Sequence, residues 1–210
     1  MVLQFGAVRF RNGTRGQHDS MLPTSGENKG LMNMGARVYV ASLSDYNNAI
    51  LHGEWFDLAD FDEETIFEAV NDMLKESPAM AKYGDVAEEW AIHDFEGFGA
   101  YRVGEYDNLA ILTALAGKLD DSRGYAFTLY LENDGTVLGD AADIDTAWDE
   151  FEDRYIGEMS MLDYAYDYIE DTGMLDAMPE TLRSYFDYEA FARDLGMDHW
   201  ETDGHLFRSY

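Results

Sequence analysis

Hydrophobic and polar residues alternate in three short stretches that follow the first 35 residues of the chain. These stretches are residues 37–43, 53–58 and 89–93. Between the last two of them, apolar side chains recur at helical spacing, at Ile66, Phe67, Val70, Met73 and Leu74. Alternation predicts half-buried strands, and the helical spacing predicts an amphipathic helix. Residues 36–99 are therefore expected to form a module of three strands and one helix.

Turn-forming and capping residues give the expected bounds of these elements. The cluster of Ser, Asp and Asn at residues 44–48 predicts a turn. Asp60, with Glu63 three residues later, predicts a capping box at the start of the helix. Pro78 predicts the end of that helix, because the residue before a proline avoids the α conformation.

A second module is predicted over residues 100–157, mainly helical with one strand. Behind an expected N-cap at Asp107, the apolar residues at 112–119 follow a helical period. Alternation at 125–132 predicts a strand. A further helical face runs through 144–155 and is expected to end near a glycine.

A third, α+β module is predicted over residues 158–210. Ser160 begins a capping-box pattern, Gly173 is a natural helix stop, and Asp187 is positioned to cap another helix. The Asp203-Gly204 pair predicts a closing hairpin. The fold class is therefore expected to be α+β, as an elongated chain of three small modules that combine mixed antiparallel sheet with helices and carry a strongly acidic surface.

The first 35 residues differ in composition from the rest. They hold four basic and two acidic residues and are rich in Gly, Asn and Ser, whereas the remaining residues carry a net charge of −31. A segment without hydrophobic periodicity cannot bury enough apolar surface to fold alone. Residues 1–35 are therefore expected to be a flexible extension. The body mixes its acids with aromatic residues, which is typical of a folded polyanion.

Composition excludes several classes of function. The chain has 210 residues, no cysteine and a formal net charge of −29, so disulfides, thiolate nucleophiles and cysteine-ligated zinc are excluded. No apolar run approaches the roughly 18 residues of a membrane span, and the N-terminus has no apolar signal segment. The expected compartment is the cytoplasm. The charge repels nucleic acid and anionic membranes and favours basic proteins as partners.

Acidic residues recur on the polar sides of the predicted helices. Spacing by four residues places carboxylates roughly 6 Å apart along one side of a helix, and such like-charge pairs destabilise it by about 0.2–0.5 kcal/mol each. A solvated surface would explain any single run, but it explains less well a charge of −31 with only ten basic residues in the same segment. The candidate functional residues are Glu64, Glu68, Asp72, Glu76, Asp149, Glu150, Glu152, Asp153, Asp163, Asp167, Glu170 and Asp171.

No catalytic or metal-binding motif stands out. His52 and His93 lack the paired spacing of a zinc protease helix. His199 and His205 flank the expected turn at Asp203, which is more typical of a polar turn than of a metal site. The sequence therefore predicts no enzymatic activity, no cofactor and no bound metal.

The size of the charge is compatible with imitation of nucleic acid. Duplex DNA carries one charge per about 1.7 Å of axis, so 31 charges at that density would cover roughly 53 Å, or about 15 base pairs. Two other classes stay open. One is an acidic, non-catalytic binding protein, such as a chaperone for basic proteins or a divalent-cation binder. The other is a halophile-adapted protein of unrelated function, which should need salt to fold.

Six segments resemble, in the same order, the ArdA-type antirestriction proteins. They are RVYVASLSDYN (37–47), LHGEW (51–55), EEWAIHDFEG (88–97), YIGE (155–158), EDTG (170–173) and YFDYEAFARDL (185–195). The similarity covers about residues 37–210, and residues 1–35 fall outside the family pattern.

The resemblance implies a DNA mimic of mobile genetic elements and phages that blocks type I restriction–modification enzymes in the bacterial host. It implies three small domains in an elongated, curved arrangement, typically as a homodimer. It also implies that the acidic surface occupies the DNA-binding groove of the restriction complex, without catalysis and without a cofactor. The twelve carboxylates named above are then the candidate DNA-mimic surface.

Overall fold

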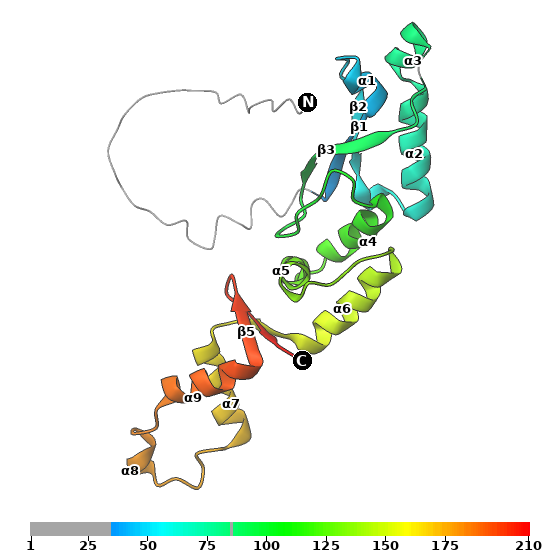
Figure 1. The fold of residues 1–210 in the computed structure, drawn as a ribbon. Coiled ribbons are helices and arrows are strands. Elements are labelled where there is room, and N and C mark those ends of the chain that lie inside the picture. Colours follow the sequence, from blue (N-terminus) through cyan, green and yellow to red (C-terminus); the bar gives the residue numbers. More distant parts are fainter. Residues whose placement is uncertain (1–34, 85) are drawn as a thin grey trace, which may run out of the picture.

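The computed structural model describes residues 35–84 and 86–210 as a mixed α+β fold. It holds two small antiparallel sheets of three strands each, with strand orders β2-β1-β3 and β4-β6-β5. Figure 1 shows the described chain as an extended molecule, with the first sheet near one end, helices α4, α5 and α6 in the middle, and the second sheet with α7, α8 and α9 toward the other end. Residues 1–34 of the expected extension lie outside the described residues.

The first sheet confirms the three predicted strands. They are β1 (Arg37–Ser42), β2 (Gly53–Asp57) and β3 (Trp90–Glu96). The central strand β1 turns Val38 and Val40, both fully buried, toward the helix α2 side, where Phe56 of β2 and Ile92 of β3 join the same core. Alternation along β1 thus places one face of the sheet in the core, as the sequence pattern predicted.

Helices cover that face and connect its strands. They are α1 (Leu43–Asn47), the 3₁₀ turn η2 (Leu58–Asp60), α2 (Glu63–Lys75) and α3 (Pro78–Tyr83). Two predictions were wrong here. The expected turn at 44–48 is the short helix α1. The capping box consists of Asp62 and Thr65 instead of Asp60 and Glu63, because Asp60 belongs to η2.

The middle of the chain is a group of three helices. They are α4 (Leu109–Leu119), α5 (Gly124–Asp134) and α6 (Ala142–Arg154). Asn108, not Asp107, caps α4. The strand predicted at 125–132 was wrong, since this segment lies within α5. Seven of the eleven α5 residues are buried, so the helix has no broad polar face that could reveal a helical period.

The C-terminal part combines the second sheet with small helices. Its elements are β4 (Tyr155–Glu158), α7 (Met161–Thr172), α8 (Glu180–Arg183), α9 (Tyr188–Leu195), η3 (Gly196–Asp198), β5 (His199–Thr202) and β6 (His205–Arg208). The predicted hairpin is confirmed, and both of its turn residues, Asp203 and Gly204, have positive φ as a tight hairpin turn needs. Strand β4 was missed, because Tyr155 continues the apolar pattern of α6 while its pairing partner is the distant Phe207.

Aromatic side chains join the second sheet to the middle helices. Phe151 of α6 contacts Phe127 of α5 and Phe207 of β6, with ring centroids 5.4 and 6.3 Å apart, and Trp200 stacks on Phe207 at 4.0 Å. Phe127, Phe151 and Phe207 are fully buried. One hydrophobic cluster runs from Val38 to Phe207. The division into modules at 36–99, 100–157 and 158–210 stays a prediction.

A buried carboxylate anchors the loop end of the first sheet. Asp45 is fully buried and accepts hydrogen bonds from the hydroxyls of Ser42 (2.7 Å) and Ser77 (2.6 Å) and from the N–H of Ala79 (2.7 Å). Burial by itself raises the pKa of Asp45, but these hydrogen bonds and the nearby His52 lower it overall. Asp45 therefore fastens α1 to the start of α3.

We expect Asp45→Asn to lower the free energy of unfolding at pH 7 by about 2–3 kcal/mol, because an amide cannot accept all of these hydrogen bonds. Urea denaturation measures this loss, with the exposed Asp149→Asn as the control. The folded-state pKa of Asp45 is depressed, so its contribution is complete above the unfolded pKa of about 3.9 and is lost as pH falls through the folded value. The two curves should therefore converge in acid. A loss no larger than that of the control would contradict this role.

Candidate functional site

All twelve carboxylates predicted to form a functional surface are exposed in the structure. They lie on three helices: Glu64, Glu68, Asp72 and the capping residue Glu76 on α2; Asp149, Glu150, Glu152 and Asp153 on α6; and Asp163, Asp167, Glu170 and Asp171 on α7. Exposure makes them accessible to a partner. Their role stays a prediction.

The α2 carboxylates point outward because the opposite side of the helix is buried. Ile66 and Val70 are no more than 1% exposed and fix the orientation of the helix. Asp72 forms an ion pair with Lys75 at 2.6 Å, in which both side chains are 73% exposed, so the pair contributes little to stability.

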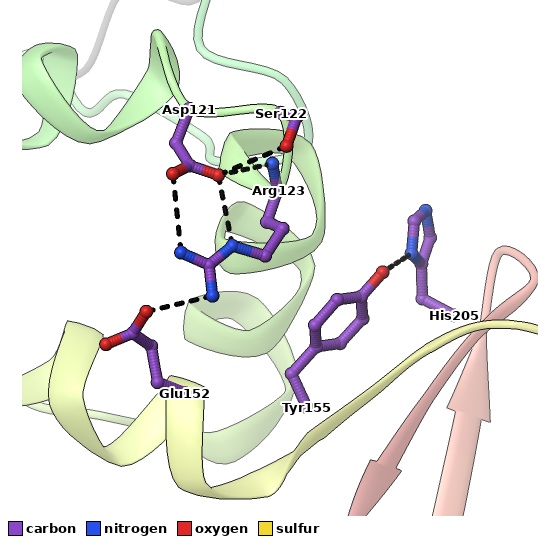
Figure 2. Close-up of polar contacts among 6 residues, drawn as sticks. All are labelled: Asp121, Ser122, Arg123, Glu152, Tyr155 and His205. Atoms are coloured by element: carbon purple, nitrogen blue, oxygen red, sulfur yellow. Dashed lines mark hydrogen bonds and ion pairs between the residues drawn. The ribbon is translucent and has the colours of Figure 1, made fainter.

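The α6 carboxylates are held at the edge of the aromatic core. Figure 2 shows Arg123 between two acids: its guanidinium donates to Asp121 at 3.1 Å and to Glu152 of α6 at 2.8 Å. The same guanidinium lies 5.1 Å from the ring centroid of Trp148. The side-chain hydrogen bond from Arg123 is the largest cause that lowers the pKa of Asp121. The ion pair with Arg123 partly neutralises the charge of Glu152.

The α7 carboxylates are exposed because the opposite side of that helix is buried through Ala165 and Ile169. Asp163 accepts the hydroxyl hydrogen of Ser160 at 2.6 Å, and its N–H donates back to the Ser160 oxygen at 3.1 Å. This confirms the predicted cap at Ser160. Asp163 thus takes part in the cap of the helix, whereas Asp167 lies on the outer side of α7 and takes no part in a cap.

Most of the predicted surface is not neutralised from within. Eight of the twelve carboxylates make no side-chain hydrogen bond or ion pair with any residue in the described ranges. These eight are Glu64, Glu68, Glu76, Asp149, Asp153, Asp167, Glu170 and Asp171. Their oxygens can therefore accept hydrogen bonds from the Lys and Arg side chains of another molecule.

The histidines considered at the final turn have ordinary partners. His199 Nδ1 lies 2.7 Å from the carbonyl oxygen of Leu195, and His205 Nδ1 lies 2.9 Å from the hydroxyl of Tyr155 (Figure 2). Among the described residues, no group of three or more His, Cys, Asp or Glu side chains is arranged to hold a metal ion. The histidines therefore link elements of the C-terminal part.

Sequence reasoning missed three exposed carboxylates that share a groove with α2. Glu54 and Asp57 on β2 and Asp60 on η2 line the same hollow as Asp72 and Glu76. The placement of Glu54 beside a helix depends on how α2 packs on β2, which periodicity alone does not give. A signal was nevertheless present, since Glu54 and the buried Phe56 are two residues apart on the strand and therefore lie on the same face.

Comparison with known families gives a clear result. A family model described as "Antirestriction protein (ArdA)" matches residues 38–206. The match confirms the resemblance seen in the sequence and covers most of the chain. A comparison with curated proteins gives no match. None of the helices within the described part of the chain is long and apolar enough to cross a membrane.

We expect Glu68→Gln to raise the free energy of unfolding at low salt by about 0.4–1 kcal/mol, because it removes like-charge pairs with both Glu64 and Asp72. Glu and Gln have similar helix propensities, so backbone preference should change little. Thermal or urea denaturation in low-salt buffer measures the gain, and repetition in 1 M NaCl is the control, since salt screens the repulsion. A gain of equal size at both salt concentrations would show that repulsion is not its cause.

Proposed function

The chain belongs to the ArdA family of antirestriction proteins, and from that membership we propose that it inhibits a type I restriction–modification enzyme by imitating B-DNA. The exposed carboxylates of α2, α6 and α7 would take the place of backbone phosphates in the DNA-binding groove of the specificity and modification core. Cleavage would be blocked by exclusion of DNA, and methylation could be blocked in the same way. The target acts on DNA in the bacterial cytoplasm, where the proposal places this protein.

The observation that carries the proposal is the set of eight exposed carboxylates that have no side-chain partner among the described residues. A DNA-binding groove gains affinity when its Lys and Arg side chains neutralise phosphates. Carboxylates accept the same charge-assisted hydrogen bonds. The protein would therefore compete with DNA for the Lys and Arg side chains of the groove. One acidic surface could then act on enzymes that recognise different DNA sequences.

The fold supports this use because it holds the acids in place. The α6 acids sit on a helix whose buried side contacts Phe127 through Trp148 and Phe151. A carboxylate on an ordered helix loses less conformational entropy on binding than one on a disordered tail. The proposal also includes the predicted three modules in an elongated arrangement, which would present the acids along the length of the groove.

We further propose that the active form is a homodimer. The C-terminal part carries exposed aromatic and apolar side chains that its own small core does not use. Tyr185 is 83% exposed, Leu182 is 52% exposed, and Tyr166, itself 48% exposed, stacks on Tyr188 at 4.3 Å. Such a surface suits contact with a second copy, and a dimer would double the length of duplex that the protein imitates.

The proposed mechanism is inhibition by binding. It needs no catalytic residue, cofactor or metal from this chain, and it requires no contact with nucleic acid or membrane. Association should be fast, because the negative charge of the protein steers it toward a basic groove.

We expect the protein to displace a fluorescent target duplex from a purified type I modification core at a near-stoichiometric ratio, with displacement weakening as salt rises. The triple variant Asp167→Asn, Glu170→Gln and Asp171→Asn should need about tenfold more protein, if each lost charge costs roughly 0.5 kcal/mol. The single variants should each change the required concentration by less than about threefold. Fluorescence anisotropy measures all of these.

The matched control keeps the charges and changes only their reach, with Asp167→Glu, Glu170→Asp and Asp171→Glu. It should displace DNA almost as well as the unaltered protein. Failure of the folded, unaltered protein to displace DNA at physiological salt would contradict the type I target. Equal loss in the control and the neutralised variant would contradict the role of charge.

A further inference from the structure

A groove of about 430 Å³ lies between β2, η2 and α2. Its floor is apolar and partly aromatic: Phe56 and Phe61 meet edge to face with centroids 5.9 Å apart, and Met73 lies beside them. Its rim carries carboxylates from three different elements. They are Glu54 and Asp57 of β2, Asp60 of η2, and Asp72 and Glu76 at the end of α2.

The chain already shows how it holds a cation. Arg123 pairs with Asp121 and Glu152 (Figure 2), and its guanidinium lies over the ring of Trp148. Three other basic residues repeat the arrangement: each lies 4.8–5.7 Å from an aromatic centroid and within 2.8 Å of a carboxylate oxygen. These are Arg37 with Trp55 and Glu96, Lys118 with Trp148 and Asp145, and Arg154 with Tyr130 and Asp134.

The groove has the aromatic rings and the carboxylates of that arrangement, but among the described residues the cation over Trp55 of its lining, Arg37, pairs with Glu96 and not with the rim. Glu54, Asp60 and Glu76 make no side-chain hydrogen bond or ion pair with the residues that the structure describes. Asp72 pairs with Lys75. Both side chains are 73% exposed, so this ion pair faces solvent. The uncompensated charge at the rim is therefore negative, and it favours a cation with an apolar body.

The size of the groove and the chemistry of its lining indicate which kind of cation it can hold. The rim carboxylates are not arranged to hold a metal ion, as is true of all acidic groups in the described ranges. A volume of this size is at the lower end of sites for small ligands, roughly 300–1,000 Å³. A long side chain can lay its methylene stem on the apolar floor and keep its charge at the rim. A planar guanidinium also stacks on an aromatic ring, which an ammonium does less well.

We propose that this groove receives an arginine side chain of the target protein, and so forms a point of concentrated affinity within a surface that otherwise binds diffusely. The inference deepens the proposed function, on which its choice of partner rests. The guanidinium would lie near Phe61 and donate to Glu54 and Glu76. Partial enclosure removes water from these contacts, which makes them worth more than an equal number of contacts on an open helix face.

The test uses the blocked peptide acetyl-Arg-Arg-Arg-amide as a probe and records backbone amide shifts of the full chain by NMR. Shifts should concentrate at residues 54–61 and 69–76. The double variant Glu54→Gln and Glu76→Gln should weaken peptide binding by about fivefold or more, since it removes the paired acceptors of the groove. The matched control Glu64→Gln and Glu68→Gln removes two charges from the same helix outside the groove, and it should weaken binding by less than about twofold.

A second variant tests the aromatic floor without changing charge. Phe61→Leu should reduce the preference for tri-arginine over tri-lysine peptide while leaving lysine binding nearly unchanged. Shifts spread evenly over α2, α6 and α7, or equal losses in the groove and control variants, would overturn the proposal. So would binding of spermidine as tightly as of tri-arginine.

These outcomes are separable from those of the proposed function. If the protein binds arginine selectively but fails to displace DNA from a type I core, the arginine site is supported and the type I enzyme is contradicted as its partner. If the protein displaces DNA but the groove and control variants behave alike, the proposed inhibition is supported and the arginine site is contradicted.

Discussion

Repulsion among carboxylates is the force that this fold has to overcome. The chain after residue 35 holds 41 acidic and ten basic residues, and helices such as α2 bring like charges within one turn of each other. The opposing contribution comes from aromatic packing. Phe151, fully buried, contacts five other aromatic side chains from α5, α6, β4 and β6. Each such ring buries a large apolar area, and favourable ring geometry adds roughly 0.5–1.5 kcal/mol per pair.

Three of the ten basic residues after residue 35 strengthen places where this packing reaches the surface. Arg123 and Lys118 cover Trp148 from the solvent side, and Arg154 covers Tyr130. Each also pairs with an acid, so one cation both shields a ring and neutralises one carboxylate. These cations lie at the edges of the core; on α2 Lys75 is the partner of Asp72, and among the described residues no α7 carboxylate has a basic partner. Stability and the exposed charge are arranged on different residues, and for this reason they can coexist.

Sequence reasoning worked where one local pattern decided the outcome. The strands of the first sheet, the buried side of α2, the cap at Ser160 and the exposure of all twelve predicted carboxylates follow from periodicity and capping. It failed where tertiary contacts decided. Helix α5 is buried on most sides and shows no period, and β4 exists because Tyr155 pairs with Phe207, 52 positions later. The groove beside Glu54 could not be predicted, since it depends on how far α2 lies from β2.

A surface of separate exposed acids and a groove with an aromatic floor make different demands on a partner. Exposed charges attract any basic surface and act mostly on the rate of association, and salt screens them. A partly enclosed contact acts mostly on the rate of dissociation, because its desolvated hydrogen bonds must break before the partner leaves. An inhibitor that must act on several enzymes needs the first property, and one that must outlast competing DNA needs the second. In the proposed mechanism the helices would supply the first and the junction of β2, η2 and α2 would supply the second, so substitutions in one place should leave the other property unchanged.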